Sequence, residues 1–291
     1  GLEALDLSKY LAAPKETDGA GGSLLTDVSS ASSLDFPLIQ LVDADLRLSS
    51  SSVILRGGTI RRAAATISLK AGKMIADIAE LEIDEGTRGG GQLRIDATGT
   101  KPSYDIRGKF AALDLGRAGQ AIFGHPTIQG RGDLVIEVSA TGDTGAALLG
   151  SLDGKMNVTL VEGGQLGIDI DELTAAAGAD NPQTAWQEAS NGSMAIDRLV
   201  AQFALANGVI KTNGAEAVAG ARKVKAKGAI DLPTRQLDVK LAIGDAPQPA
   251  ATDTDSEEMD APMKERDVVG LYGPWKRPSL RSGTIETGTP H

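Results

Sequence analysis

The sequence predicts a mainly β protein, a long antiparallel meander that forms a curved or groove-like sheet with a few short helices capping it. Three observations predict this class. Apolar and polar residues alternate in many short segments, glycine-containing pairs separate these segments, and helical spacing is confined to a few short stretches. Strands that recur every ~8 to 12 residues favour hairpins, because a βαβ unit would place a helix between successive strands.

Alternation is clearest in four segments, residues 92–98, 133–140, 155–161 and 236–243. In each, every second side chain is aliphatic and the side chains between are mostly polar, as in a strand with one buried and one wet face. The apolar members are Leu93, Ile95, Leu134, Ile136, Val138, Met156, Val158, Leu160, Leu237, Val239 and Leu241. Weaker alternation predicts strands at residues 41–48, 53–56, 59–69, 73–83, 103–110, 194–205, 208–213 and 223–232.

Glycine-containing sequences predict the hairpin turns. Two-residue hairpin loops need positive φ, which glycine and asparagine adopt readily. The candidates are Arg56-Gly57-Gly58, Ala71-Gly72, Glu85-Gly86, Glu162-Gly163-Gly164, Asn207-Gly208 and Asn213-Gly214. The run Gly89-Gly90-Gly91 lacks the helix and Lys-Ser/Thr of a phosphate cradle, so we interpret it as a flexible loop.

Four stretches carry helical spacing instead, namely residues 113–123, 144–152, 168–177 and 184–189. The third has Asp169, Asp171 and Glu172 in its opening turn, where negative charge suits the helix dipole. We expect these short helices to cap the ends of the sheet.

Charge and composition divide the chain into four parts. Residues 1–33 are interpreted as a partly flexible lead-in and 34–244 as the β-rich domain. Residues 245–267 contain eight acidic and two basic residues, a net charge of −6 out of −10 for the chain, and read as an acidic flexible linker. Residues 268–291 form a C-terminal segment with Gly-Pro-Trp and a tail. The chain begins with glycine and has no signal peptide, so we expect a fragment of a longer protein.

Composition argues against an enzyme, and we predict no catalytic residue, no metal site and no cofactor. The chain has no cysteine and two histidines, and no Gly-x-Ser-x-Gly elbow accompanies His125. The acidic balance argues against nucleic-acid binding. The pairs Asp43/Asp45 and Asp169/Asp171 are interpreted as solvated carboxylates, and Arg131-Gly132-Asp133 as part of a strand rather than an adhesion motif.

The repeated aliphatic face has two interpretations. The sheet could fold over and bury the face as a closed core, leaving the edge strands or residues 268–281 to bind a protein partner by strand addition. Alternatively, the face is an open groove for acyl chains, lined by the eleven aliphatic side chains named above. Aromatic residues are only 3% of the chain, so the wall would be smooth and aliphatic.

The order of motifs in residues 130–172 resembles the C-terminal region of AsmA-like envelope proteins of Gram-negative bacteria. The motifs are Ala140-Thr141-Gly142, Leu148-Leu149, Leu152-Asp153-Gly154-Lys155, Gly163-Gly164 and Gly167-Ile168-Asp169-Ile170. Residues 5–11, 206–209 and 228–232 are similar to other parts of this family, and Gly273-Pro274-Trp275-Lys276-Arg277-Pro278 to its closing element.

This resemblance implies a non-enzymatic protein of outer-membrane biogenesis. The region would lie in the periplasm, and an N-terminal helix outside this sequence would anchor the parent protein in the inner membrane. A curved β-sheet would hold or pass phospholipid, or another acyl-chain lipid, along its hydrophobic groove. Envelope proteins would be further partners.

Overall fold

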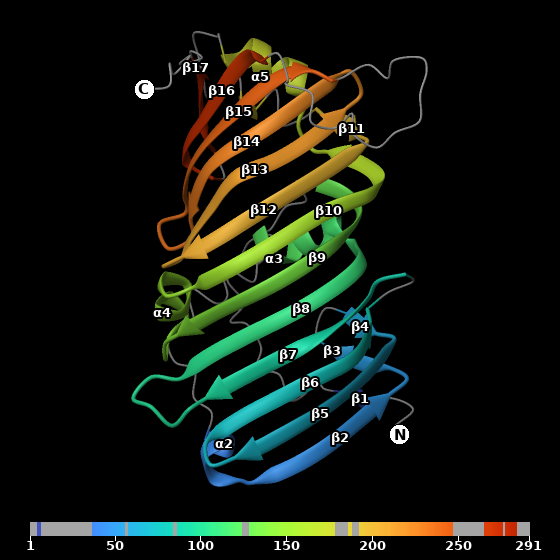
Figure 1. Cartoon of the computed structure of the whole chain (residues 1–291), viewed down its shortest axis with the longest axis vertical. Coiled ribbons are helices and arrows are strands. Elements are labelled where there is room, and N and C mark those ends of the chain that lie inside the picture. Colours follow the sequence, from blue (N-terminus) through green and yellow to red (C-terminus); the bar gives the residue numbers. More distant parts are fainter. Residues whose placement is uncertain are drawn as a thin grey trace, which may run out of the picture.

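The computed structural model describes residues 5–6, 37–55, 58–83, 86–123, 128–177, 186–187, 192–246, 265–275 and 277–283. Among them, 14 strands form one antiparallel sheet that meanders along the whole molecule (Figure 1). The predicted fold class is confirmed: the protein is mainly β, with a few short helices among the described residues.

Each strand of the main sheet pairs with the next strand of that sheet along the chain, even where a helix or a short strand lies between them in the sequence. Its order is β2 (Ala44–Ser50), β5 (Arg62–Lys70), β6 (Lys73–Glu82), β7 (Arg88–Asp96), β8 (Ser103–Asp114), β9 (Ile128–Thr141), β10 (Asp153–Leu166), β12 (Arg198–Ala206), β13 (Val209–Ala219), β14 (Arg222–Asp231), β15 (Gln236–Asp245), β16 (Glu265–Pro274) and β17 (Ser279–Gly283). The short β11 (Met194–Ile196) also pairs with β10.

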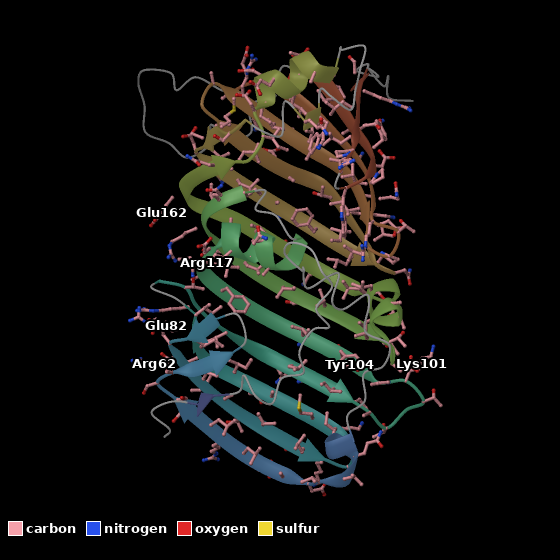
Figure 2. All side chains as sticks on the ribbon, turned by 180° about the vertical axis from the view of Figure 1, so that it is seen from behind. Arg62, Glu82, Lys101, Tyr104, Arg117 and Glu162 are labelled. Carbon is pink, nitrogen blue, oxygen red and sulfur yellow. The ribbon has the colours of Figure 1, made fainter. Side chains whose placement is uncertain are left out.

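A second, three-stranded sheet consists of β1 (Leu5–Asp6), β3 (Val53–Leu55) and β4 (Gly58–Ile60). The helices are α2 (Pro37–Leu41), α3 (Leu115–Phe123), α4 (Gly145–Gly150) and α5 (Ile170–Ala177). Seen from behind, α3 lies in front of the middle of the main sheet and α5 lies at its C-terminal end (Figure 2).

Strand register divides the main sheet into two faces. Directly opposed residues on antiparallel strands project to the same side of a sheet, and side chains alternate along each strand. Leu93 lies opposite Ile106 on the neighbouring strand, and Ile106 lies opposite Val138 on the next. We name the side of the sheet that carries them the apolar face. Arg94, Asp105 and Ser139 are likewise opposed on the other side, the polar face.

Two of the predicted turns are confirmed and two are wrong. Residues 71–72 and 207–208 form turns, with φ of 49° and 77° in the first and 51° and 75° in the second. The sequences at 162–164 and 213–214 instead lie inside β10 and β13, where the pairing register shifts at a β-bulge. A bulge accommodates one extra residue in a continuing strand, and its glycine can have the same positive φ as a turn glycine, as Gly163 does at 75°. The turn positions Arg56, Gly57 and Glu85 lie outside the described residues.

The bulges gather along one edge of the sheet, where β6, β8 and β10 end. The register shifts lie between Ala64/Ala65, Ile78/Leu81, Phe110/Leu113, Leu160/Gly164, Val200/Ala204, Thr212/Ala215 and Ile243/Gly244. Figure 2 labels Glu82, Arg117 and Glu162 along this edge and Tyr104 at the opposite one. Because bulges bend strands and increase their twist, their alignment curves the sheet along one side.

Three predicted helices are confirmed as α3, α4 and α5. Thr144 caps α4 by accepting a hydrogen bond from the Ala147 amide. The fourth predicted helix is described only at residues 186–187, which are helical. Helix α2 was not predicted, because five residues are too few to show helical periodicity.

The C-terminal segment continues the main sheet. β16 pairs with β15 and β17 pairs with β16, so much of the segment predicted over residues 268–291 belongs to the β-rich body. Asp245 ends β15 and residues 265–267 begin β16, so strand pairing takes up both ends of the stretch interpreted as a linker. Residues 247–264 lie outside the described residues, as do residues 1–33 apart from β1.

Candidate hydrophobic binding face

One row of apolar residues crosses twelve consecutive strands of the main sheet without a polar side chain. Each member is the direct cross-strand partner of the next, so all lie on the apolar face. The row is Leu46, Ile67, Ala76, Leu93, Ile106, Val138, Gly154, Leu205, Ile210, Ile230, Leu237 and Gly273. The apolar face is therefore continuous from β2 to β16.

Near the N-terminal end, helix α2 covers part of this face. Ile39 of α2 forms a buried cluster with Ile95 and Ala97, and Met74 and Leu93 pack against the cluster. The Gln40 side chain donates a hydrogen bond to the carbonyl oxygen of Ala97 at 3.1 Å, which fixes the helix to the end of β7.

At the C-terminal end, helix α5 covers the apolar face more completely. Leu173 of α5 is fully buried against Ile243, Val269 and Leu280, each of which is 1% exposed. The Asp169 carboxylate caps the helix by accepting hydrogen bonds from the amides of residues 171 and 172. Arg222 reaches from the sheet to Asp171, with 2.9 Å between guanidinium nitrogen and carboxylate oxygen. The Asp169/Asp171 pair therefore serves the helix, as a cap and as a tether.

A third buried cluster lies beside helix α3. It contains Leu160, Ile196, Leu199 and Ala219, and Leu115 of α3 packs against it. This cluster fills the bulged edge of the sheet at β10 and β12.

Between these three clusters, the described side chains of the apolar face are only partly buried. Leu134, Ile136, Val138, Met156 and Val158 are all half-buried, and none belongs to a buried cluster of the described residues. Ile106, in the same row as Val138, is 43% exposed. The central strands therefore present aliphatic side chains that lie outside the clusters packed against α2, α3 and α5.

All eleven predicted groove residues lie on the apolar face, but their surroundings differ. Ile95 and Leu160 are buried core residues, at 6% and 2% exposure. Leu93 packs against the cluster under α2, and the three residues of β15, Leu237, Val239 and Leu241, pack against the cluster under α5. The other five are the half-buried residues of the central strands.

Several residues in the centre of the apolar face were not predicted. Ile106, Phe110 and Phe203 are on the apolar face by register, within the segments of weaker alternation. The ring of Phe110 lies directly over Gly89, its cross-strand partner, where a Cβ atom would collide with it. Residues 89–91 belong to β7, so their interpretation as a flexible loop is wrong. Their lack of side chains lets Phe110 and neighbouring backbone approach closely.

The Arg131-Gly132-Asp133 sequence lies in β9 and stabilises a bulge. Ala112, with φ of 50°, sits in the bulge of β8. Its amide donates to Asp133 Oδ1 at 3.0 Å, and its carbonyl oxygen accepts from Arg131 at 2.9 Å. Both charged side chains thus satisfy the backbone of one irregular residue, which favours a structural role. His125 lies outside the described residues.

The polar face of the N-terminal and central strands carries opposed charges. Lys73 pairs with Asp96 at 2.8 Å and Lys155 with Glu137 at 3.2 Å. Hydrogen bonds from Lys73 and Thr98 hold the pKa of Asp96 well below its usual range. Such solvated pairs lack the contrasting, water-poor carboxylates that acid–base chemistry uses.

Within the described ranges, no group of three or more His, Cys, Asp or Glu side chains could hold a metal ion. No helix in the same part of the chain is long and apolar enough to cross a membrane.

Comparison with known proteins identifies a family. No curated protein and no solved structure matches the chain. A model of the AsmA family matches residues 30–215, which span β2 to most of β13 and hence the central apolar face. This match covers more than half of the 291 residues. The chain therefore belongs to the AsmA family, whose members are associated with the cell envelope.

Proposed function

We propose that the open central part of the apolar face binds the acyl chains of phospholipid, and that the protein thereby serves outer-membrane biogenesis. The observation that carries this proposal is the row of apolar residues across twelve strands, half-buried or exposed at Ile106 and Val138. Large exposed apolar surfaces on a folded protein usually mark a binding site.

The chemistry of the face suits hydrocarbon. Its central members are Leu, Ile, Val and Met, and the aromatic residues of these strands on this side include Tyr104, Phe110 and Phe203. Aliphatic side chains give non-directional contact, and each methylene of a ligand buried on them contributes about 0.8 kcal/mol. Membership of the AsmA family supports a site in the cell envelope, where phospholipid is abundant.

We further propose that the region works in the periplasm, attached to the inner membrane through a helix outside this sequence, and without an enzymatic step. The polar face supports the absence of catalysis, because its carboxylates are solvated or paired with lysine.

A matched pair of substitutions tests the binding proposal. Met156 and Asn157 are adjacent on β10 and project to opposite faces. We expect Met156→Glu to reduce phospholipid that co-purifies with the protein, measured by native mass spectrometry, because a carboxylate on the apolar face opposes acyl chains. Asn157→Glu adds the same charge to the polar face and should leave the bound lipid unchanged. Equal lipid content in all three proteins, or lipid-free wild type that also fails to bind a fluorescent fatty acid, would reject acyl-chain binding.

A second candidate function is binding of a protein partner by strand addition at the edge strand β2. Leu46 and Leu48 of β2 project to the apolar face yet are 43% and 38% exposed. An unpaired edge with exposed apolar side chains can accept another strand. Introducing proline at Arg47 should abolish capture of such a partner while lipid content stays normal, which separates the two functions.

A further inference from the structure

A row of exposed basic side chains crosses the polar face at the C-terminal end of the sheet. Register aligns Lys227 of β14, Lys240 of β15, Gly270 of β16 and Arg281 of β17 as successive cross-strand partners. The three basic side chains are exposed and form no ion pair within the described residues. Like charges directly opposite each other destabilise a sheet, so the fold alone does not explain Lys227 opposite Lys240.

The neighbouring charges do not neutralise this row. Glu216, the acidic residue opposite Lys225, is shared by Lys223 at 3.1 Å and Lys225 at 3.3 Å. Burial alone would raise the pKa of Glu216, but hydrogen bonds from these two lysines outweigh it and the pKa is lowered. Asp238 is two residues from Lys240 on the same face and forms no ion pair among the described residues.

Tyr272 lies in the space above Gly270, the one residue of the row without a side chain. The ring of Tyr272 lies over Gly270, and a Cβ atom at Gly270 would be 2.7 Å from the phenol oxygen. The guanidinium carbon of Arg281 is 5.4 Å from the centre of the same ring. The phenol hydroxyl therefore lies over the strand that separates Lys240 from Arg281.

We propose that Lys227, Lys240, Tyr272 and Arg281 form a binding surface for the phosphate groups of anionic lipid headgroups. Guanidinium, ammonium and phenol groups all donate hydrogen bonds, and phosphate oxygens accept them, most strongly from charged donors. The donors are spread over four adjacent strands spaced ~4.8 Å apart, a width that suits a membrane surface rather than one small ion. This site lies on the opposite face from the acyl-chain surface and does not depend on it.

Vesicle binding tests the proposal, because the chain has a net charge of −10 and its overall charge would repel an anionic surface. The probe is vesicles of phosphatidylcholine with about 30% phosphatidylglycerol, against pure phosphatidylcholine, at about 50 mM salt. Wild type should float with the anionic vesicles only. The double variant Lys227→Glu/Lys240→Glu should bind at least ~10-fold more weakly, and Tyr272→Phe a few-fold more weakly. Lys109→Glu, an exposed lysine on the polar face of β8, is the control and should bind within ~2-fold of wild type.

Three results would overturn the proposal. In the first, wild type binds both kinds of vesicle equally, or binds neither. In the second, Lys109→Glu loses as much binding as the double variant Lys227→Glu/Lys240→Glu. In the third, inorganic phosphate shifts the NMR signals of Arg281 and Tyr272 and also displaces the protein from anionic vesicles no better than chloride at equal ionic strength, which would assign the site to free phosphate. Circular dichroism of each variant confirms folding, and unchanged co-purified lipid in the double variant separates this site from the apolar face.

Discussion

The C-terminal end and the centre of the apolar face have the same sequence pattern but different surroundings. Leu241 and Ile243 lie two positions apart in an alternating segment, as do Leu134 and Ile136. Under α5 the face is a core, with Ile243 1% exposed, whereas Leu134 and Ile136 remain half-buried. Alternation therefore determines which side chains lie together, while a separate helix determines whether they become a core or a surface.

The largest expected effect comes from the side chain that makes the C-terminal end a core. Leu173→Ala should lower the free energy of unfolding by about 2 to 5 kcal/mol, because it leaves a cavity among Ile243, Val269 and Leu280. Leu134→Ala, on the open centre, should cost less than about 1.5 kcal/mol, since its side chain is already partly solvated. Urea denaturation measures both, and equal losses would contradict the distinction between core and surface.

The next largest effect concerns the bulge of β8, where the Ala112 amide donates a hydrogen bond to Asp133. Asp133→Ala removes the acceptor of the Ala112 amide and should cost about 1 kcal/mol. Asp105→Ala, on the polar face of the same strand as Ala112, should change stability by no more than about 0.5 kcal/mol. Thermal unfolding compares the two variants, and an effect of Asp105→Ala as large as that of Asp133→Ala would reject the role of the bulge contact.

A smaller effect is expected from the ion pair between Asp171 of α5 and Arg222 of the sheet. Asp171→Asn weakens the ion pair with Arg222 and should cost about 0.5 kcal/mol, an effect that high salt reduces. Amide hydrogen exchange in α5 should become faster while exchange in β9 stays the same. Uniformly faster exchange would mean that α5 and the centre unfold together.

The smallest effect concerns the ion pair of Lys73 and Asp96 on the polar face, at the N-terminal end of the sheet. Because Lys73 and Thr98 lower the pKa of Asp96, this carboxylate contributes stability above its ordinary pKa, and that contribution is lost as pH falls toward the lowered value. Lys73→Met should therefore move the titration of Asp96, followed by carboxyl ¹³C NMR, to higher pH. Unchanged titration would show that Lys73 is not the cause.

Much of the sheet could be predicted, because a strand with one wet face must alternate. Leu93, Ile136 and Val158 were placed on one face by the period of two, and register confirms this. The sequence could not separate Asn207-Gly208, a turn, from Asn213-Gly214, part of a bulge, since the same residues suit both conformations.

The sequence predicts which side chains lie on the apolar face, but it does not predict which of them are exposed. Ile95 and Leu160 have the same alternation as Ile136 and Val158, yet α2 and the cluster beside α3 bury them. The docking of these helices depends on contacts between distant residues, which a local pattern does not contain. Phe110 was missed because it matters through its position over Gly89, on the neighbouring strand.

A meander can also become longer or shorter by the addition or removal of hairpins. Almost every strand pairs with its neighbours in the sequence, so removing or inserting one hairpin leaves all other pairings intact. Each added hairpin would extend the apolar face by about 10 Å at the usual strand spacing. Like a repeat protein, such a sheet can change its reach in steps without a new topology, and its strands can fold onto one another in order along the chain.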